Sequence, residues 1–445
     1  MTGIKTVKFG GTSLADAKQI RKAASIIQSD PTRRCVVVSA PGKRYPGDAK
    51  VTDVLYALAR ASKKTRRELC AAIISRYQSI IDCIGLKIDF SQWLQEALEE
   101  GDKMGRSDKK NYIASRGEYW MAKIIAEILG YEFISADSFI VFDNGGLFDL
   151  LQTEKLAKSI RLKKIATKRG IVIPGFYGAM PDGKIKTFSR GGSDITGAIV
   201  AACVKAEIYE NWTDVPGVLM ADPRIVKNPR RIKELTYHEL RELAFMGADV
   251  LHEEAVFPVR KRSIPINVRD TNHPRNPGTM IVSQSSRQAR VIGSIIGIAG
   301  RRGFSVIRIE KTLMDSEVGF LRRVCQVMEK HCVSIEDIPG GIDVLSVIVR
   351  SSEFDPISRV ALRELKKDCA PEAISVEKNM ALICVVGSAM AAAPGVAARI
   401  FKAIASVSVN VRMISQGSSE INIVIGVDEK DYEISTRAIY REFEK

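Results

Sequence analysis

Val7-Lys8-Phe9-Gly10-Gly11-Thr12-Ser13 is the stretch that decides the fold at the start of the chain. Apolar residues from Ile4 predict a strand that runs into a glycine pair, after which Thr12 or Ser13 is placed to cap a helix. At such a junction, bare backbone N–H groups and the positive end of the helix dipole face one point, which favours an anion. Lys8 adds a cation beside that point. Alone, the stretch is equally compatible with an ordinary strand–helix turn.

Two later segments repeat this chemistry. Phe188-Ser189-Arg190-Gly191-Gly192-Ser193-Asp194 leads into a second helical pattern. Trp212-Thr213-Asp214-Val215-Pro216-Gly217 follows the apolar strand Ala206 to Tyr209. Each segment alone is weak evidence, but two basic Gly–Gly turns and a Thr-Asp loop on one chain predict one polyphosphate held from several sides.

Short apolar strands alternate with helical patterns in the first part of the chain. The β-branched run Cys35 to Ser39 predicts a buried parallel strand. Further strands are expected at Glu132 to Ser135, Gly170 to Pro174, Ala206 to Tyr209 and Pro265 to Val268. Helical patterns lie between them, at Val51 to Arg60, Glu154 to Lys163, Asp194 to Lys205 and His238 to Phe245. This alternation predicts an α/β fold with a mainly parallel sheet and helices on both faces.

The last part of the chain carries an internal repeat. Gly319–Val349 superposes on Gly395–Ile425 without a gap, at an offset of 76 residues. Each copy has the order of a Gly turn, an amphipathic helix, a strand, a turn and an alternating strand. The ungapped match places Asn410 and Arg412 on Ser334 and Glu336.

Composition limits the classes of protein that this chain can belong to. Its 445 residues suffice for two or three domains. The eight cysteines form no C-x-x-C pair and the four histidines have no metal-ligand spacing, so we expect a reduced, cytoplasmic protein without a metal site of its own. No secretory leader and no membrane span are expected. The net charge of +15 sits in clusters without interleaved aromatic residues, which favours solvated helix faces over a nucleic-acid partner.

The motifs, taken in order, resemble those of aspartate kinases, a branch of the amino-acid-kinase family. The matching segments are KFGGTS at the start, VVVSAPGK after it, SRGE at Ser115–Glu118, FSRGGSD, and WTDVPG…DPR at Trp212–Arg224. The resemblance covers essentially the whole chain. It implies an amino-acid-kinase-like three-layer α/β domain over residues 1–290. Two ferredoxin-like (βαββαβ) ACT domains are then expected over 300–378 and 379–445, where the internal repeat lies.

The same resemblance implies a reaction. The γ-phosphoryl group of ATP, with Mg²⁺ carried by the nucleotide, would pass to the side-chain carboxylate of L-aspartate to give 4-phospho-L-aspartate. This is the first step of lysine, threonine and methionine biosynthesis. A carboxylate is already an anionic nucleophile, so catalysis should be positioning and charge neutralisation. Lys8 is expected on the transferring phosphoryl group, and Asp194 is expected to orient Lys8.

Individual site residues follow from their places in the matched motifs. Glu118 suits the ammonium of aspartate, and Arg190 suits its α-carboxylate. Ser39 and Thr52 are expected as hydroxyl contacts to the same substrate, although both are also compatible with capping roles. The expected nucleotide contacts are Lys8, Gly10, Gly11, Ser193, Thr213, Asp214 and Arg224. For Arg224, a purely structural Asp-Pro-Arg turn is the alternative.

The tandem repeat implies feedback inhibition, with L-lysine as the favoured effector and threonine as a second. The first copy holds the expected pocket, formed by Met314, Val318, Gly319, Phe320, Leu321, Ser334 and Glu336. Pairing of such repeats between chains implies a homo-oligomer, either a dimer or a tetramer.

The sequence departs from the family pattern in two places. Asp249 stands where many relatives have Lys in a G-A-K-V-L-H-P segment, and Leu219 stands where some have Tyr. Two alternatives to an aspartate kinase stay open. One is another amino-acid kinase, acting on glutamate or an acetylated amino acid, and the other is a catalytically weak amino-acid sensor.

Overall fold

The computed structural model describes residues 3–189, 191–248, 251, 256–284, 295–391 and 393–444. The chain divides into two compact units. The first comprises Met1–Val218, Lys233–Tyr237 and Val250–Ser285, and the second comprises Leu219–Ile232, His238–Asp249 and Ser286–Lys445. The second unit therefore includes two segments that lie well before the internal repeat.

An eight-stranded sheet forms the centre of the first unit, with the strand order β3-β4-β2-β1-β7-β9-β10-β8. All neighbours are parallel except β9 and β10, which are antiparallel. The strands are β1 (Lys5–Phe9), β2 (Arg33–Val38), β3 (Glu132–Phe133), β4 (Ile171–Pro174), β7 (Ile208–Thr213), β8 (Glu234–Thr236), β9 (Ile266–Asp270) and β10 (Thr279–Val282). A separate hairpin joins β5 (Tyr177–Ala179) to β6 (Ile185–Thr187). The mainly parallel α/β sheet predicted from the sequence is confirmed.

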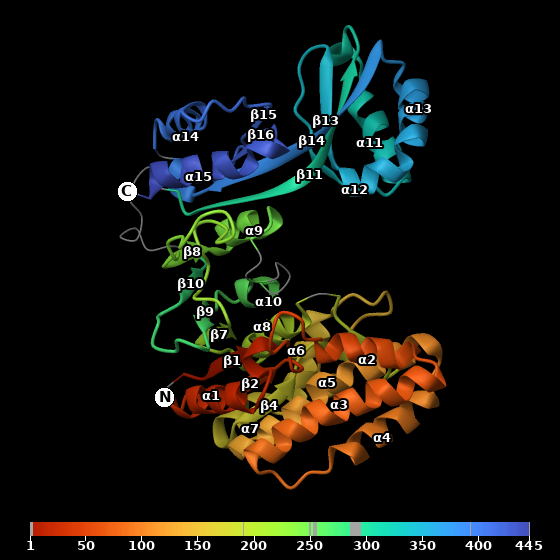
Figure 1. Ribbon diagram of the computed structural model, residues 1–445, viewed down its shortest axis with the longest axis vertical. Helices are drawn as coiled ribbons and strands as arrows, with labels where there is room; N and C mark the ends of the chain where they lie inside the picture. Colours follow the sequence, from red (N-terminus) through yellow and green to blue (C-terminus); the bar gives the residue numbers. More distant parts are fainter. Residues whose placement is uncertain are drawn as a thin grey trace. The chain divides into compact units, whose positions relative to one another are not determined.

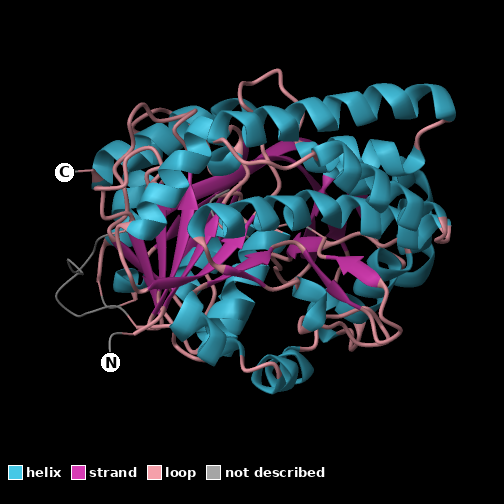
Figure 2. Ribbon diagram, turned by 90° about the horizontal axis from the view of Figure 1, so that it is seen from below, coloured by secondary structure: helices cyan, strands magenta, loops and turns pink. Residues whose placement is uncertain are grey.

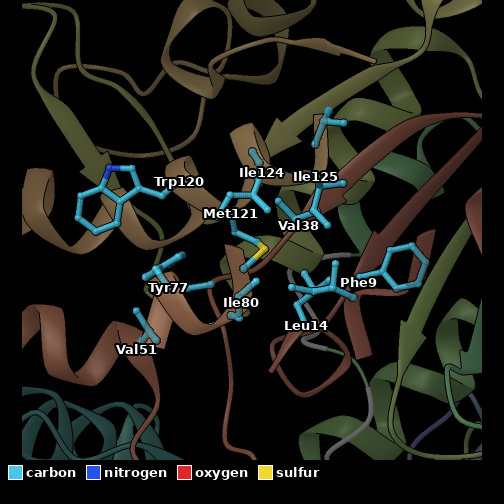
Figure 3. Packing of buried hydrophobic residues seen from close by; sticks show 14 of the residues in the cluster. Phe9, Leu14, Val38, Val51, Tyr77, Ile80, Trp120, Met121, Ile124 and Ile125 are labelled. Atoms are coloured by element: carbon cyan, nitrogen blue, oxygen red, sulfur yellow. The ribbon is translucent and has the colours of Figure 1, made fainter. Parts of the chain in front are cut away.

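Helices cover both faces of this sheet (Figure 2). One face packs on α1 (Ala17–Gln28), α2 (Val51–Arg60), α3 (Lys63–Ile84), α4 (Phe90–Asp102) and α5 (Arg106–Leu129). The other carries α6 (Leu150–Ser159), α7 (Leu162–Arg169), α8 (Gly192–Val204) and α10 (Val256–Arg260). Figure 3 shows the core on the first face, where Phe9 and Val38 from the sheet lie among Leu14, Tyr77, Trp120 and Met121. Side chains alternate between the two faces along a strand. Lys8, which lies between Val7 and Phe9, therefore points away from this core and toward α8.

The start of α1 differs from the sequence-based prediction. Thr12 and Ser13 do not cap it, because they form a 3₁₀ turn over Thr12–Leu14. The cap is Asp16, whose side chain accepts a hydrogen bond of 2.9 Å from the backbone N–H of Gln19. The turn thus separates the glycine pair from α1 and shapes the loop that follows β1.

The second unit holds a six-stranded antiparallel sheet in the order β12-β13-β11-β14-β16-β15. Its strands are β11 (Gly297–Glu310), β12 (Ile335–Asp337), β13 (Val344–Arg350), β14 (Ala373–Val386), β15 (Met413–Ser415) and β16 (Asn422–Asp428). Its helices are α9 (Tyr237–Phe245), α11 (Phe320–Lys330), α12 (Ser351–Phe354), α13 (Ser358–Cys369), α14 (Val396–Ala405) and α15 (Tyr432–Phe443). The long strands β11 and β14 run through both halves of the sheet, as Figure 1 shows. The expected boundary between residues 378 and 379 falls within β14 and remains a proposal.

The internal repeat is present, but its two copies differ in length. Cys332 and Ser408 both adopt positive φ after their helices, which preserves the offset of 76 to that point. Beyond it, the buried positions of β13 match those of β16 at an offset of 78, with Leu345 on Ile423 and Val349 on Val427. The strand pairing keeps the offset of 76 as far as β15, because Asp337 pairs with Ile348 and Met413 pairs with Gly426, the residue equivalent to Ile348. The two extra residues therefore lie in the turn between β15 and β16, and the predicted match of Arg412 with Glu336 is consistent with this pairing. A shift of two residues keeps every side chain on the same face of a strand, so the alternating pattern could not reveal it.

No helix in the described residues is long and apolar enough to cross a membrane. All eight cysteines are free thiols. Among the described residues, no group of three His, Cys, Asp or Glu side chains is arranged to hold a metal ion.

Candidate active site

Loops that follow four parallel strands meet at one edge of the sheet in the first unit. The backbone N–H of Gly10, after β1, donates to the carbonyl of Trp212 in β7 (3.0 Å). Ser39, after β2, donates to the carbonyl of Phe9 (3.2 Å), and Gly175, after β4, donates to the carbonyl of Val38 (2.9 Å). The ladder thus continues past the strands and fixes the first glycine turn against its neighbours. The carboxyl edge of a parallel sheet is the usual place for a ligand site.

The first glycine turn lies directly against the loop after β2. Gly42 donates a backbone hydrogen bond of 2.7 Å to the carbonyl of Gly11. A Cβ added to Gly42 would lie 2.6 Å from the backbone nitrogen of Thr12, so glycine lets the two loops pack this closely. In the part of the chain that the structure describes, the N–H groups of Gly11 and Thr12 have no hydrogen-bond acceptor. These two unpaired backbone donors at the glycine turn form a cradle suited to an anion.

Lys8 supplies a fixed positive charge at this cradle. Its Nζ lies 2.5 Å from Oδ1 of Asp194 and 3.3 Å from Oδ1 of Asn211, and the residue is 7% exposed. A Cβ added to Gly10 would lie 3.5 Å from the same Nζ, so the ammonium lies over the glycine turn. The structure thus brings Lys8, Gly10, Gly11 and Asp194 together, and their roles toward a ligand remain predictions.

Asn211 was missed in the sequence analysis. It lies on β7 and donates from Nδ2 to Oδ1 of Asp194 (3.0 Å), so it holds both members of the ion pair. The available signal was a polar residue inside the strand Ile208–Thr213, directly before the Trp-Thr-Asp motif.

The second glycine turn begins α8. Gly191 precedes the helix with a φ of 59°, and Ser193 and Asp194 lie in its first turn. Thr196 donates to the carbonyl of Gly192 (2.8 Å) and accepts from the backbone N–H of Phe176 (3.1 Å). Phe176 has a φ of 80°, which non-glycine residues rarely adopt. Arg190, the residue expected to bind the α-carboxylate, lies outside the described residues.

Glu118 is buried on α5, facing the loop after β2. A Cβ added to Gly117 would lie 2.8 Å from Cβ of Ala40, so glycine lets the helix approach that loop closely. The carboxylate accepts a hydrogen bond from the backbone N–H of Ala40, yet its Oε2 has no partner within the described ranges. Burial raises the pKa of Glu118 to about 8. A buried carboxylate with an unused oxygen is suited to a cationic ligand.

The remaining predicted contacts occupy less constrained places. Ser39 and Thr52 are partly buried, Thr52 being the second residue of α2. Thr213 ends β7 and donates to Oδ1 of the exposed Asp214 (3.2 Å). Arg224 belongs to the second unit and pairs with Asp222 in its own turn (2.6 Å), as the structural alternative predicted. The role of Arg224 toward a nucleotide, and the roles of the other four residues, remain predictions.

The predicted effector residues lie at the start and edge of the first repeat. Gly319 caps α11 with a φ of 81°, Met314 and Phe320 are buried, and Val318 and Leu321 are exposed. Glu336 on β12 is paired with Arg350 on β13, with 2.7 Å between Oε1 and Nε, and its side chain is 4% exposed. Ser334 is exposed, and its backbone N–H donates to Glu353. The Glu336 carboxylate is therefore neutralised within the chain.

Comparison with known proteins identifies the family. A profile of the amino acid kinase family matches residues 4–270, and an ACT domain profile matches residues 383–443. The chain belongs to the amino acid kinase family. It is 39% identical to aspartokinase 3 of Bacillus subtilis over 451 residues, covering 99% of this chain and 98% of that protein.

Solved structures agree with this assignment over the full length of the chain. The aspartate kinase of Clostridium acetobutylicum superposes with a TM-score of 0.87 at 43% identity, covering 99% of this chain and all of that one. Aspartokinase III of Escherichia coli is 25% identical. Its R-state complex with aspartate and ADP superposes with a TM-score of 0.80 (99% of this chain, 100% of that one), and its T-state complex with lysine and aspartate with 0.76 (100% of each). The resemblance to aspartate kinases and the predicted fold class are both confirmed.

Proposed function

We propose that this chain is an aspartate kinase, which transfers the γ-phosphoryl group of ATP to the side-chain carboxylate of L-aspartate and forms 4-phospho-L-aspartate. The observation that carries the proposal is the unpartnered Oε2 of Glu118, buried beside the loop that contacts the first glycine turn. An amino-acid substrate supplies the ammonium that this oxygen lacks. The Escherichia coli relative that binds aspartate and ADP supports the same substrate pair.

The chemistry follows from the charges at the site. The substrate carboxylate is already a nucleophile, so no base is required, and the barrier arises from bringing two anions together. Lys8, held by Asp194 and Asn211, neutralises charge on the transferring phosphoryl group. The N–H groups of Gly11 and Thr12 and the N-terminus of α8 stabilise the phosphate oxygens without reorganisation. Mg²⁺ enters with the nucleotide as part of the substrate.

The second part of the proposal concerns regulation by the second unit. The chain covers all of the Escherichia coli structure that binds lysine and aspartate, including its C-terminal region. We assign to this chain inhibition by L-lysine at the first repeat, with threonine as a second effector, and assembly of a cytoplasmic homodimer or tetramer through the ACT domains. The enzyme then controls the first step of lysine, threonine and methionine biosynthesis.

The two alternatives make different demands on the site. A kinase for an N-acetylated amino acid offers Glu118 no ammonium, and a sensor without activity needs no fixed ion pair between Lys8 and Asp194. Release of ADP should therefore be measured with aspartate, glutamate and N-acetylglutamate as acceptors. Of the three acceptors, we expect only aspartate to support release of ADP. Release of ADP with glutamate or N-acetylglutamate instead of aspartate would indicate another amino-acid kinase. Release of ADP with none of the three would indicate a sensor without activity.

A further inference from the structure

A charged loop borders the first glycine turn. It runs from Gly42 to the start of α2 at Val51 and carries three cations, Lys43, Arg44 and Lys50. Most of its residues are exposed, but the Asp48 side chain is only 9% exposed. The loop is therefore held to the body of the first unit at one acidic residue.

Arg76, from α3, is the anchor. It is 7% exposed, donates to the carbonyl of Gly42, and lies 2.9 Å from Oδ2 of Asp48. Arg44 binds the same carboxylate through Nε (2.8 Å) and through its backbone N–H (3.0 Å). Burial acts to raise the pKa of Asp48, but hydrogen bonds from Arg44 and from the backbone of Ala49, together with the charge of Arg44, hold this pKa below its usual value. Both arginines are thus committed to Asp48, whereas Lys43 has no partner among the described residues.

Lys43 is within reach of the anion cradle. It follows Gly42, whose added Cβ would lie 2.6 Å from the nitrogen of Thr12. Consecutive Cα atoms are 3.8 Å apart, and a lysine carries its ammonium on a flexible four-carbon stem. With Gly42 fixed by Arg76, the Lys43 side chain starts one residue from this contact, so its ammonium can reach an anion bound at the Gly11 and Thr12 N–H groups.

The cradle needs more positive charge than Lys8 provides. Lys8 shares its charge with Asp194 at 2.5 Å, so the pair is close to neutral as a unit. A nucleoside triphosphate brings several negative charges. We propose that Lys43 binds the terminal phosphates of the nucleotide as a second, mobile cation, and that the Arg76–Asp48 anchor positions it. The proposal rests on the proposed function for the identity of the ligand.

Binding of the magnesium complexes of ATP and ADP, and of AMP, should be measured by isothermal titration calorimetry without aspartate. In Lys43→Ala we expect about tenfold weaker binding of ATP, a smaller loss for ADP, and AMP binding within about twofold of wild type. Lys43→Arg keeps the charge and should stay close to wild type. Lys87→Ala removes an exposed lysine from the loop between α3 and α4 and serves as the matched control.

Two results would overturn the assignment: ATP affinity of Lys43→Ala within about twofold of wild type, or an equal loss for all three nucleotides. Because the titration needs no acceptor, it is independent of the reaction. If wild type binds ATP and Lys43→Ala binds it weakly, but no aspartyl phosphate forms, then the proposed function fails and the Lys43 site stands. If aspartyl phosphate forms and Lys43→Ala keeps its affinity, then only the Lys43 site fails.

Discussion

The ammonium of Lys8 on β1 lies 2.5 Å from the carboxylate of Asp194 on the first turn of α8, and Asn211 on β7 bonds to both. Three elements that are distant in sequence thus fix one cation over the glycine turn. An ion pair that is already formed does not have to be assembled during the reaction, which is the physical basis of electrostatic preorganisation.

Replacing Lys8 by Ala should reduce aspartate-dependent turnover by at least about 100-fold, because one preorganised cation is lost from the transition state. The far-ultraviolet circular dichroism spectrum should remain that of wild type. Lys5→Ala is the matched control, since Lys5 lies on the same strand and pairs instead with Asp30 (2.7 Å). Turnover of Lys8→Ala near that of Lys5→Ala would remove Lys8 from the site.

Aspartate affinity should depend on pH through Glu118. Burial raises the pKa of Glu118 to about 8, so the carboxyl is protonated in the free protein below that pH. An ammonium requires the ionised form, and affinity should therefore fall about tenfold per unit from about pH 8 to pH 6. Calorimetry at pH 7 in two buffers of different ionisation enthalpy should show proton release on binding. Glu118→Gln should bind aspartate weakly with no such release, and a flat profile for wild type would contradict the assignment.

The raised pKa of Glu118 should make the stability of the protein fall with rising pH, whereas aspartate affinity should rise. In the folded protein the pKa of Glu118 is about 8, whereas the ordinary value, which applies to the unfolded chain, is 4.5. Between these two pH values the folded state therefore holds the proton more tightly than the unfolded state. The free energy of unfolding of wild type, relative to Glu118→Gln, should therefore fall as the pH rises through this window. Urea titrations at several pH values measure this difference, and a relative stability that rises with pH would be inconsistent with a buried, protonated Glu118.

Gly42→Ala should damage the nucleotide site. The new Cβ would lie 2.5 Å from the backbone carbon of Gly11, and two backbones cannot separate without moving the glycine turn. We expect at least about tenfold weaker ATP binding. Gly47→Ala, in the same loop, meets nothing closer than Tyr45 at 3.8 Å and should bind ATP like wild type. Equal affinities for the two variants would show that the contact between Gly42 and Gly11 does not shape the site.

Substitutions of Glu336 and Arg350, which form one ion pair, should change the half-inhibitory lysine concentration in opposite directions. Arg350 occupies Glu336 in the structure at 2.7 Å, so an effector ammonium must compete with it. Glu336→Ala should raise the half-inhibitory lysine concentration about tenfold, and Arg350→Gln should lower it. Arg308→Gln, which removes an exposed partner of Glu310 on β11, is the control. Unchanged inhibition in Glu336→Ala would move the effector pocket elsewhere.

Local sequence patterns predicted most helices and strands of the first unit, because each of these elements is marked by residues that are close together in the sequence. A glycine pair after an apolar strand identifies a turn that approaches a ligand, and helical spacing identifies α1 and α8. Contacts between distant segments carry no such signature. Asn211 reads as one of several polar residues in its strand, and its bonds to Lys8 and Asp194 depend on the strand order. Asp16 replaced Thr12 and Ser13 as the cap because the residues after the glycine pair first form a 3₁₀ turn.

The second unit shows a different limit. The repeat was visible because both copies bury the same helix face, but the alternating strands tolerate a shift of two residues. The sharing of β11 and β14 between the two halves of the sheet depends on pairing partners that periodicity cannot specify. Arg190 and Asp249 fall outside the described residues, so the assignment of Arg190 to the α-carboxylate and the consequence of Asp249 remain predictions.

Formation of aspartyl hydroxamate is the most direct test of the proposed reaction. Purified protein is incubated with MgATP, L-aspartate and hydroxylamine, and hydroxamate and ADP are measured together for wild type and Lys8→Ala. We expect equal amounts of both products with wild type, none without aspartate, and a rate at least about 100-fold lower with Lys8→Ala. Absence of hydroxamate with wild type, or undiminished formation by Lys8→Ala, would contradict it.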